Sequence, residues 1–268
     1  MVEDICVKSR DLLFVISLFS VVIVITFITL PILRIMTGSS IKTLTETLKD
    51  REALNSIWLS VYTSGLAAFI SFFLGTPLAY LLSRFNFFGK RFVESIVDLP
   101  IVIPHPVIGI AILLVVGKNY WFGDLLYRLG IKLMGSVAGI ITVLTFVAIP
   151  FYTNMAKEGF DSIPVRLEKV SRSLGASMIE TFVHVTFPLA KRSMIVGFIM
   201  ALARSISEFG AVVIVAYHPM IAPVLIYERF ESYGLKYSLP VAFWLVFISL
   251  SLFLILRILI NEKSRGRV

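Results

Sequence analysis

The sequence has few of the residues that carry enzyme chemistry. Of its 268 residues, 16% are charged, one is cysteine and three are histidine. The single cysteine, Cys6, excludes an internal disulfide framework and a multi-cysteine metal site. His105, His184 and His218 lie on separate segments, and no H-E-x-x-H or G-x-S-x-G spacing occurs. We therefore expect no catalytic residue and no metal site.

A phosphate-binding loop is also absent. The segment from Gly38 to Thr43 contains a lysine and a threonine but lacks the second glycine of the G-x-x-x-x-G-K-[ST] pattern. We expect this chain neither to hydrolyse ATP nor to bind a cofactor.

Apolar residues are abundant, at 57% of the sequence. This is well above the roughly 45–50% of a soluble domain, so the chain is predicted to be a polytopic membrane protein in contact with lipid. The net charge of +8 is explained first by basic loops on one side of a bilayer, and nucleic acid is not expected as a partner.

Six apolar stretches are each long enough to cross a membrane as a helix. The first is too long for a signal-peptide core and is expected to be retained. An all-α fold follows, with an amino-terminal part (1–55), a transmembrane domain (56–260) and a carboxyl-terminal tail (261–268). The expected spans are 12–33, 56–82, 92–116, 137–155, 194–217 and 239–260.

The third stretch is interrupted by Pro100, Pro104 and Pro106. Prolines leave backbone groups that lipid cannot satisfy, so part of this segment should face protein or a water-filled cavity. His105 lies between two of these prolines, where it is either a ligand or pH-sensitive group, or a structural residue.

The distribution of basic residues predicts the orientation. Six spans place both termini and the loops after spans two and four on one face. Fifteen of the 25 lysines and arginines fall on that face, nine on the other, and Arg204 lies within span five. The positive-inside rule puts the basic face, with both termini, in the cytoplasm, and the protein in the cell membrane.

The polar segment 157–192 separates spans four and five. Asp161 to Pro164 contains a capping side chain and a proline suited to a first turn, which predicts that a helix starts there. The apolar residues that follow recur at helical spacing: Leu167, Val170, Leu174 and Met178. A short amphipathic helix is expected.

A second short helix should follow a glycine. Gly175 suits the left-handed conformation that ends a helix, and Ser177 with Glu180 has the spacing of a capping box. Pro188 is expected to end this helix before span five begins. Spacing alone leaves three interpretations open, namely a solvated connector, a helix on the lipid surface and a docking element for a soluble partner.

Span five contains an acid and a base. Arg204 and Glu208 are four residues apart, so they can pair on one helical face. They either fix helix packing or line a translocation path or gate.

The segment 157–192 resembles the EAA loop of the membrane subunits of bacterial and archaeal ABC importers. Lys169-Val170-Ser171, Gly175 and Val185-Thr186-Phe187-Pro188 match its spacing of E-A-A, three residues, G, nine residues, I-x-L-P. The three residues at 169–171 depart from E-A-A, while Glu168 supplies a glutamate one position earlier. The stretches 98–104, 173–177 and 203–211 are similar to permeases of the molybdate, tungstate and sulfate branch.

The resemblance implies an importer permease. Its first loop helix would be the coupling helix, inserted into a cleft of a cytosolic ATPase subunit that uses ATP and Mg²⁺. The implied partners are a second permease subunit in a homodimer, two such ATPases and an external binding protein for molybdate or tungstate, with sulfate as the alternative. Pathway or gate candidates are Arg204, Glu208 and Pro104. The implied coupling residues are Val165, Arg166, Leu167, Glu168, Lys169, Val170, Ser171, Arg172, Leu174, Gly175, Ala176, Ser177 and Pro188.

Two other classes of function remain open. A secondary transporter would use an ion gradient, although no pair of interrupted helices with ion ligands is evident. A membrane docking scaffold would use the loop without substrate-dependent ATP turnover.

Overall fold

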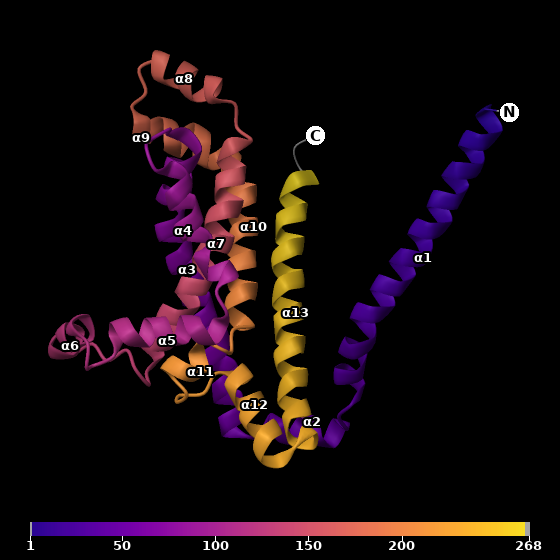
Figure 1. Ribbon diagram of the computed structural model, residues 1–268, viewed down its shortest axis with the longest axis vertical. Helices are drawn as coiled ribbons and strands as arrows, with labels where there is room; N and C mark the ends of the chain where they lie inside the picture. The colour runs from indigo at the N-terminus through magenta and orange to yellow at the C-terminus, as the bar shows by residue number, and fades with distance from the viewer. Residues whose placement is uncertain (1, 266–268) are drawn as a thin grey trace.

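The computed structural model describes residues 2–265, and this range is helical without strands (Figure 1). Its elements are α1 (Val2–Thr37), α2 (Ile41–Thr47), α3 (Arg51–Arg84), α4 (Lys90–Val102), α5 (His105–Val116), α6 (Trp121–Arg128), α7 (Val137–Asp161), α8 (Val165–Ser173), α9 (Met178–Thr181), η1 (Phe182–Thr186, a π-helical turn), α10 (Phe187–Ile206), α11 (Val212–Val215), α12 (Ala222–Tyr233) and α13 (Leu235–Arg265).

The membrane class is confirmed by five helical stretches within residues 2–265 that are long and apolar enough to cross a bilayer. They are Phe14–Thr37, Arg51–Arg84, Val137–Asp161, Met178–Ile206 and Leu235–Leu256, and the bent pair α4–α5 makes up to six. The amino-terminal end of α1, the carboxyl end of α13 and helices α8 and α9 lie at one end of the molecule (Figure 1). Helices α2, α6, α11 and α12 lie at the other end.

The core is formed where α3, α7 and α10 pack together. Small residues such as Ala68, Ala148 and Ala201 are fully buried there and let the helices approach closely. Gly75 of α3 lies against α7, because a Cβ at this position would be 2.5 Å from the ring of Tyr152. The large side chains Tyr152 and Phe160 of α7 fill the remaining space.

The predicted interruption of the third span is a bend of 115° between α4 and α5. The chain passes Pro100, which is buried inside α4, and turns at Ile103 and Pro104 instead. Pro104 is the N-cap of α5, and His105 and Pro106 begin that helix. Only the second proline group therefore breaks the helix.

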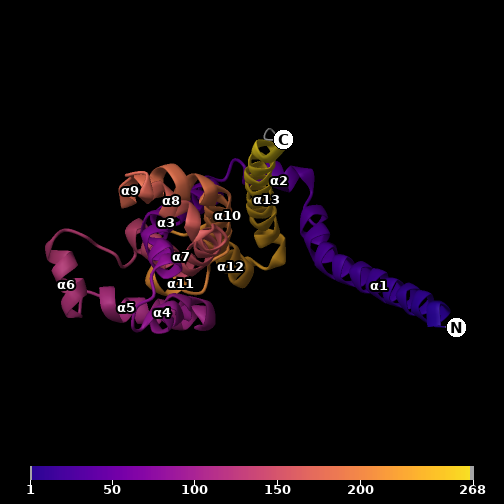
Figure 2. The same cartoon turned by 90° about the horizontal axis from the view of Figure 1, so that it is seen from above.

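The first helix stands away from the rest of the chain (Figures 1 and 2). In its apolar stretch Phe14–Thr37, no residue of the most apolar part is buried against the rest of the chain. The loop expected after it contains the short helix α2, and Asp50 caps α3 by accepting hydrogen bonds from the backbone N–H groups of Glu52 and Ala53.

The fifth span differs from the prediction at both ends. We expected 194–217, but the helical stretch runs through α9, η1 and α10 from Met178 to Ile206. The predicted stop at Pro188 is therefore wrong. The π-helical turn before it lets Phe187 N–H bond to the carbonyl of Phe182, which widens the helix where the proline ring would otherwise clash. The predicted end at Met155 for the fourth span is also too early, since α7 continues to Asp161.

Candidate functional site

The amphipathic helix predicted after residue 161 is α8. It begins at Val165 with Pro164 as its N-cap, whereas Asp161 is the last residue of α7 and Ser162 caps the carboxyl end of α7. The predicted side-chain cap is therefore wrong, and Pro164 stands one position before the first helical residue. The reason is that α7 extends further than its apolar pattern indicated.

The glycine elbow forms as predicted. Gly175 has a φ of +95°, in the left-handed region that favours glycine. Its N–H donates to the carbonyl of Arg172, and the N–H of Ala176 donates to the carbonyl of Ser171. These two bonds make the Schellman arrangement, which satisfies carbonyls at the end of α8 and reverses the chain.

The second loop helix begins with the predicted capping box. The Ser177 hydroxyl accepts from the N–H of Glu180 at 3.2 Å, and the Glu180 carboxylate accepts from the N–H of Ser177 at 2.7 Å. This helix is only α9, which passes directly into η1 and α10. The elbow is thus connected to the fifth span without a flexible joint.

Most of α8 is exposed in this chain. Its apolar residues Leu167 and Val170 are exposed, as is Leu174 just after it, with 84% of its surface accessible. Arg166, Lys169 and Arg172 are also exposed, whereas Ser171 and Ala176 are half-buried. An apolar and basic surface of this kind is suited to a partner protein that covers it.

Glu168 is the exception on α8, because only 8% of it is exposed. Its carboxylate accepts from Arg84 Nε at 2.8 Å and from the Thr186 hydroxyl at 2.9 Å. Arg84 lies in the last turn of α3, where a cation is favoured by the helix dipole. The sequence could not identify this pair, because its members are 84 positions apart.

The Arg204–Glu208 pair forms, but Glu208 lies outside the helix. Helix α10 ends at Ile206, and a break separates it from α11. Arg204 Nη2 donates to Glu208 Oε2 at 2.7 Å, and the N–H of Ala211 donates to Glu208 Oε1 at 2.9 Å. The Glu208 side chain is 1% exposed, so it is buried with partners on both oxygens.

His105 joins this pair from α5. Its Nδ1 lies 3.3 Å from Glu208 Oε2, and Arg204 Nη2 lies 2.9 Å from both ring nitrogens. The neighbouring Pro104 is exposed at the bend. The bend between α4 and α5 and the break between α10 and α11 thus meet at one charged cluster, His105–Arg204–Glu208. The proline-flanked position of His105 was the only sequence signal for its membership.

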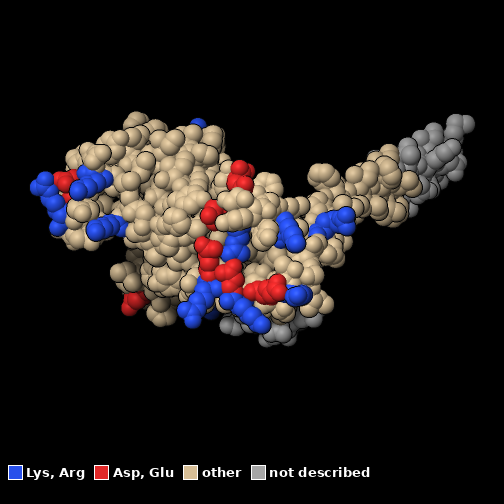
Figure 3. Space-filling view, turned by 90° about the horizontal axis from the view of Figure 1, so that it is seen from below, with Lys and Arg blue, Asp and Glu red and all other residues tan. Residues whose placement is uncertain are grey.

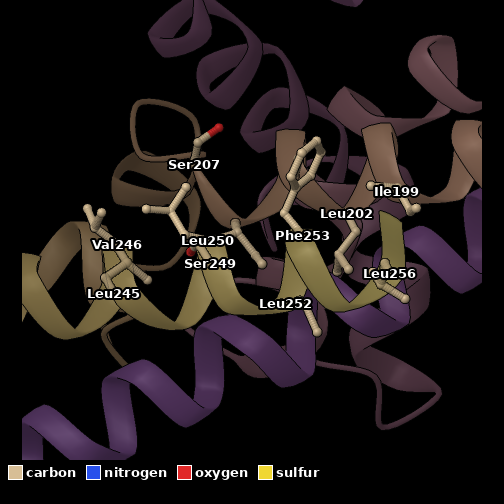
Figure 4. A pocket seen from close by; sticks show the side chains of 12 residues that line it. Ile199, Leu202, Ser207, Leu245, Val246, Ser249, Leu250, Leu252, Phe253 and Leu256 are labelled. Atoms are coloured by element: carbon tan, nitrogen blue, oxygen red, sulfur yellow. The ribbon is translucent and has the colours of Figure 1, made fainter. Parts of the chain in front are cut away.

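An apolar groove lies between α10 and α13 (Figure 4). It is lined by leucine, isoleucine, valine, phenylalanine and alanine side chains together with Ser207 and Ser249. None of the described residues that line it is charged, so a desolvated dianion would find no compensating charge from them. This groove is unsuited to an anion route.

A second charged cluster lies at the end of the molecule away from α8, around α12 and the start of α3. Viewed from below, acidic and basic side chains gather around its centre, and further basic ones extend over α6 (Figure 3). Arg229 of α12 donates to Asp50 at 2.6 Å and to Glu52 at 2.9 Å, which ties α12 to the start of α3. Burial acts to raise the pKa of Asp50, but the Arg229 and backbone hydrogen bonds outweigh it and hold that pKa below its usual value.

Relatives of known sequence cover nearly the whole chain. A molybdate/tungstate transport system permease protein, WtpB, of Pyrococcus furiosus is 42% identical over 245 residues, or 91% of this chain and 92% of the relative. A probable sulfate transport system permease protein, cysT, of Chlorokybus atmophyticus is 32% identical over 84% of this chain and 81% of its own.

The fold is shared with a solved transporter. A bacterial ABC transporter that imports the acidic polysaccharide alginate superposes with a TM-score of 0.75 over 97% of both chains, at 17% identity. Residues 71–264 match the family described as the binding-protein-dependent transport system inner membrane component. The chain is an integral membrane protein that belongs to this family of permease subunits.

Proposed function

We propose that this chain is the permease subunit of an ATP-driven importer and forms the translocation pathway for molybdate or tungstate delivered by an external binding protein. The observation that carries the proposal is the 42% identity to a molybdate/tungstate permease over 91% of the chain, together with its family membership. ATP and Mg²⁺ would be used by a partner ATPase, since this sequence has no phosphate-binding loop.

The helix–glycine–helix segment would contact that ATPase. The exposed residues of 165–174 would seat in the ATPase, Gly175 would set the elbow angle, and Ser177 and Pro188 would direct the chain into α10. Support comes from the exposed apolar and basic surface of α8 and from the continuous helix that leads from the elbow into the fifth span. The excess of basic residues at this end favours a cytoplasmic orientation of the loop and both termini in the cell membrane.

The His105–Arg204–Glu208 cluster would act as part of a gate. It connects the two broken helical segments α4–α5 and α10–α11, which are places where the backbone can change direction at low cost. Because Glu208 is already paired with Arg204, the cluster need not repel a passing dianion. Pro104 would act as the hinge of α5.

A second copy of the chain would complete the membrane domain. The apolar stretch of α1 makes few contacts with its own chain, which leaves a lipid-length apolar helix free to pack on a neighbour. We propose a homodimer of permeases with two cytosolic ATPases and one external binding protein, six spans in each permease, and the domain limits 1–55, 56–260 and 261–268.

The transport cycle then follows from population shift. ATP brings the two ATPases together, and each α8 moves with the ATPase in which it sits. The nucleotide state thereby biases an inward-open against an outward-open arrangement of the spans.

The test is reconstitution of the chain with its ATPase and binding protein in vesicles. We expect molybdate or tungstate, added with the binding protein, to raise ATP turnover and to accumulate inside. No stimulation by molybdate, tungstate or sulfate would refute the oxyanion assignment. A gradient-driven uptake without the ATPase would instead indicate a secondary transporter.

Sulfate is the second candidate, because a probable sulfate permease is 32% identical over 84% of the chain. All three anions are tetrahedral dianions, and selection among them would reside mainly in the binding protein. Stimulation by sulfate alone in the same vesicles would favour this alternative.

A further inference from the structure

We propose that Glu168 is a positioning residue that makes α8 move as one body with the membrane helices. The inference rests on the proposed coupling role of α8 and assigns the transmission of its movement to a buried ion pair rather than to the elbow alone. Its partners, Arg84 and Thr186, lie on the last turn of α3 and on η1.

The geometry of the pair is that of a fixed joint. The side chains of Arg84 and Glu168 are 7% and 10% exposed, with Arg84 Nε 2.8 Å from Glu168 Oε1. The same oxygen accepts from the fully buried Thr186 hydroxyl at 2.9 Å. A buried ion pair separates only at the cost of desolvated charges, so it resists the sliding that apolar contacts permit.

Arg84 uses its other nitrogens on the chain that leads into α8. Arg84 Nη2 donates to the carbonyl of Ile163 at 3.2 Å, and Arg84 Nη1 donates to the Ser83 hydroxyl at 3.2 Å. The Ser83 hydroxyl in turn donates to the carboxylate of Asp161 at the end of α7. The Arg84 guanidinium therefore bonds directly to the chain before α8 and to Glu168 within it, and through Ser83 to the end of α7.

The network reaches a further membrane helix. Lys157 of α7 lies 3.3 Å from Asp161 and 3.4 Å from Glu94 of α4. Polar contacts thus link α8 to α3, α7, α4 and η1 in one continuous network, and η1 continues directly into α10. A displacement of α8 would be delivered to all four membrane helices at their ends.

Other links between α8 and the membrane domain are few. The Ser171 hydroxyl lies 3.1 Å from the Thr181 hydroxyl, and the remaining polar side chains of α8 are exposed. Among the described residues of α8, Glu168 alone forms an ion pair with a membrane helix. Loss of its charge should leave α8 attached to its partner but loosely attached to the spans.

The main experiment compares Glu168→Gln with Glu158→Gln in the reconstituted complex. Glu158 is a matched control, because it is an exposed glutamate in the last turn of α7, at the same end of the molecule as α8. We expect Glu168→Gln to assemble with the ATPase, while substrate transported per ATP falls at least tenfold. Glu158→Gln should transport as much substrate per ATP as the unmodified protein. Thr186→Val should lower transport per ATP by less than Glu168→Gln does, and Thr186→Ser, which keeps the hydroxyl, should transport normally.

A second measurement does not depend on transport. Spin labels at Ser173 and at Leu81, both exposed, report the separation of α8 and α3 in the ATPase-bound complex of a Cys6→Ser background. We expect one narrow distance distribution that shifts little with nucleotide, and a broad nucleotide-dependent one in Glu168→Gln.

The two measurements separate the possible failures. Normal transport per ATP in Glu168→Gln, or an unchanged label distribution, overturns the positioning role. Loss of ATPase binding in Glu168→Gln also overturns it, because Glu168 would then contact the partner directly. If no oxyanion stimulates ATP turnover in the unmodified complex, the proposed substrate is wrong. The spin-label distance distributions then test the positioning role of Glu168 by themselves.

Discussion

Replacement of Gly175 tests the elbow directly. Its φ of +95° lies in the left-handed region, and beyond its two chain neighbours no described atom lies within 4 Å of the position that a Cβ would occupy. A substitution at this position therefore meets no steric contact with other parts of the chain. Its effect comes from the local backbone alone.

The magnitude follows from that backbone conformation. A left-handed conformation costs an L-residue about 1–2 kcal/mol, and a β-branched residue more. This energy corresponds to a change of about 5–30-fold in a conformational equilibrium. Gly175→Ala should lower the equilibrium constant for forming the Schellman turn by about that factor, and Gly175→Val by more.

The assay measures ATP turnover and oxyanion uptake in the same reconstituted vesicles. We expect Gly175→Val to assemble and to hydrolyse ATP while uptake per ATP falls, because α8 no longer meets α9 at the required angle. Gly89→Val is the matched control. Gly89 has a φ of +85° and equally open surroundings, but it lies between α3 and α4.

Two outcomes would refute this reasoning. Normal uptake per ATP in Gly175→Val would remove the elbow from the mechanism. An equal loss in Gly89→Val would show that backbone strain anywhere at this end of the protein disturbs transport.

Three further predictions concern other parts of the chain. Arg204→Ala should destabilise the protein in detergent by about 3–5 kcal/mol, because it leaves the buried Glu208 carboxylate without its arginine. Glu208→Ala should cost less, because the Arg204 side chain is partly exposed, and the double variant should recover part of the Arg204→Ala loss. Additive melting-temperature losses would contradict the pairing. The pKa of Asp50 is lower in the folded protein than in the unfolded chain, so its ionised carboxylate stabilises the fold above the unfolded pKa, and this stabilisation is lost as pH falls through the folded pKa. The melting-temperature difference between the unmodified protein and Asp50→Asn should therefore shrink at acid pH. A difference that stays constant with pH would argue against the Arg229 bond. Removal of α1 should leave the melting temperature of the remaining chain nearly unchanged but abolish the dimer in native mass spectrometry, and a dimer that persists would place the interface elsewhere.

Local sequence signals predicted the two short helices of segment 157–192 well. Gly175 and the capping box of Ser177 and Glu180 need only residues within one turn, so their geometry is encoded locally. Helix α8 starts later than predicted because α7 continues to Asp161, beyond the end of its apolar pattern. Pro188 failed as a stop signal because the π-helical turn before it accommodates the ring.

By itself, the sequence determined the membrane class, the apolar helices and the helix–glycine–helix segment, because hydropathy and capping depend on neighbours along the chain. Only the tertiary structure decided that Glu168 meets Arg84, that His105 joins Arg204 and Glu208, and that the third span bends at Pro104. Such contacts join residues about 80 to 100 positions apart. Their partners are chosen by the packing of α3, α7 and α10, which no local pattern specifies.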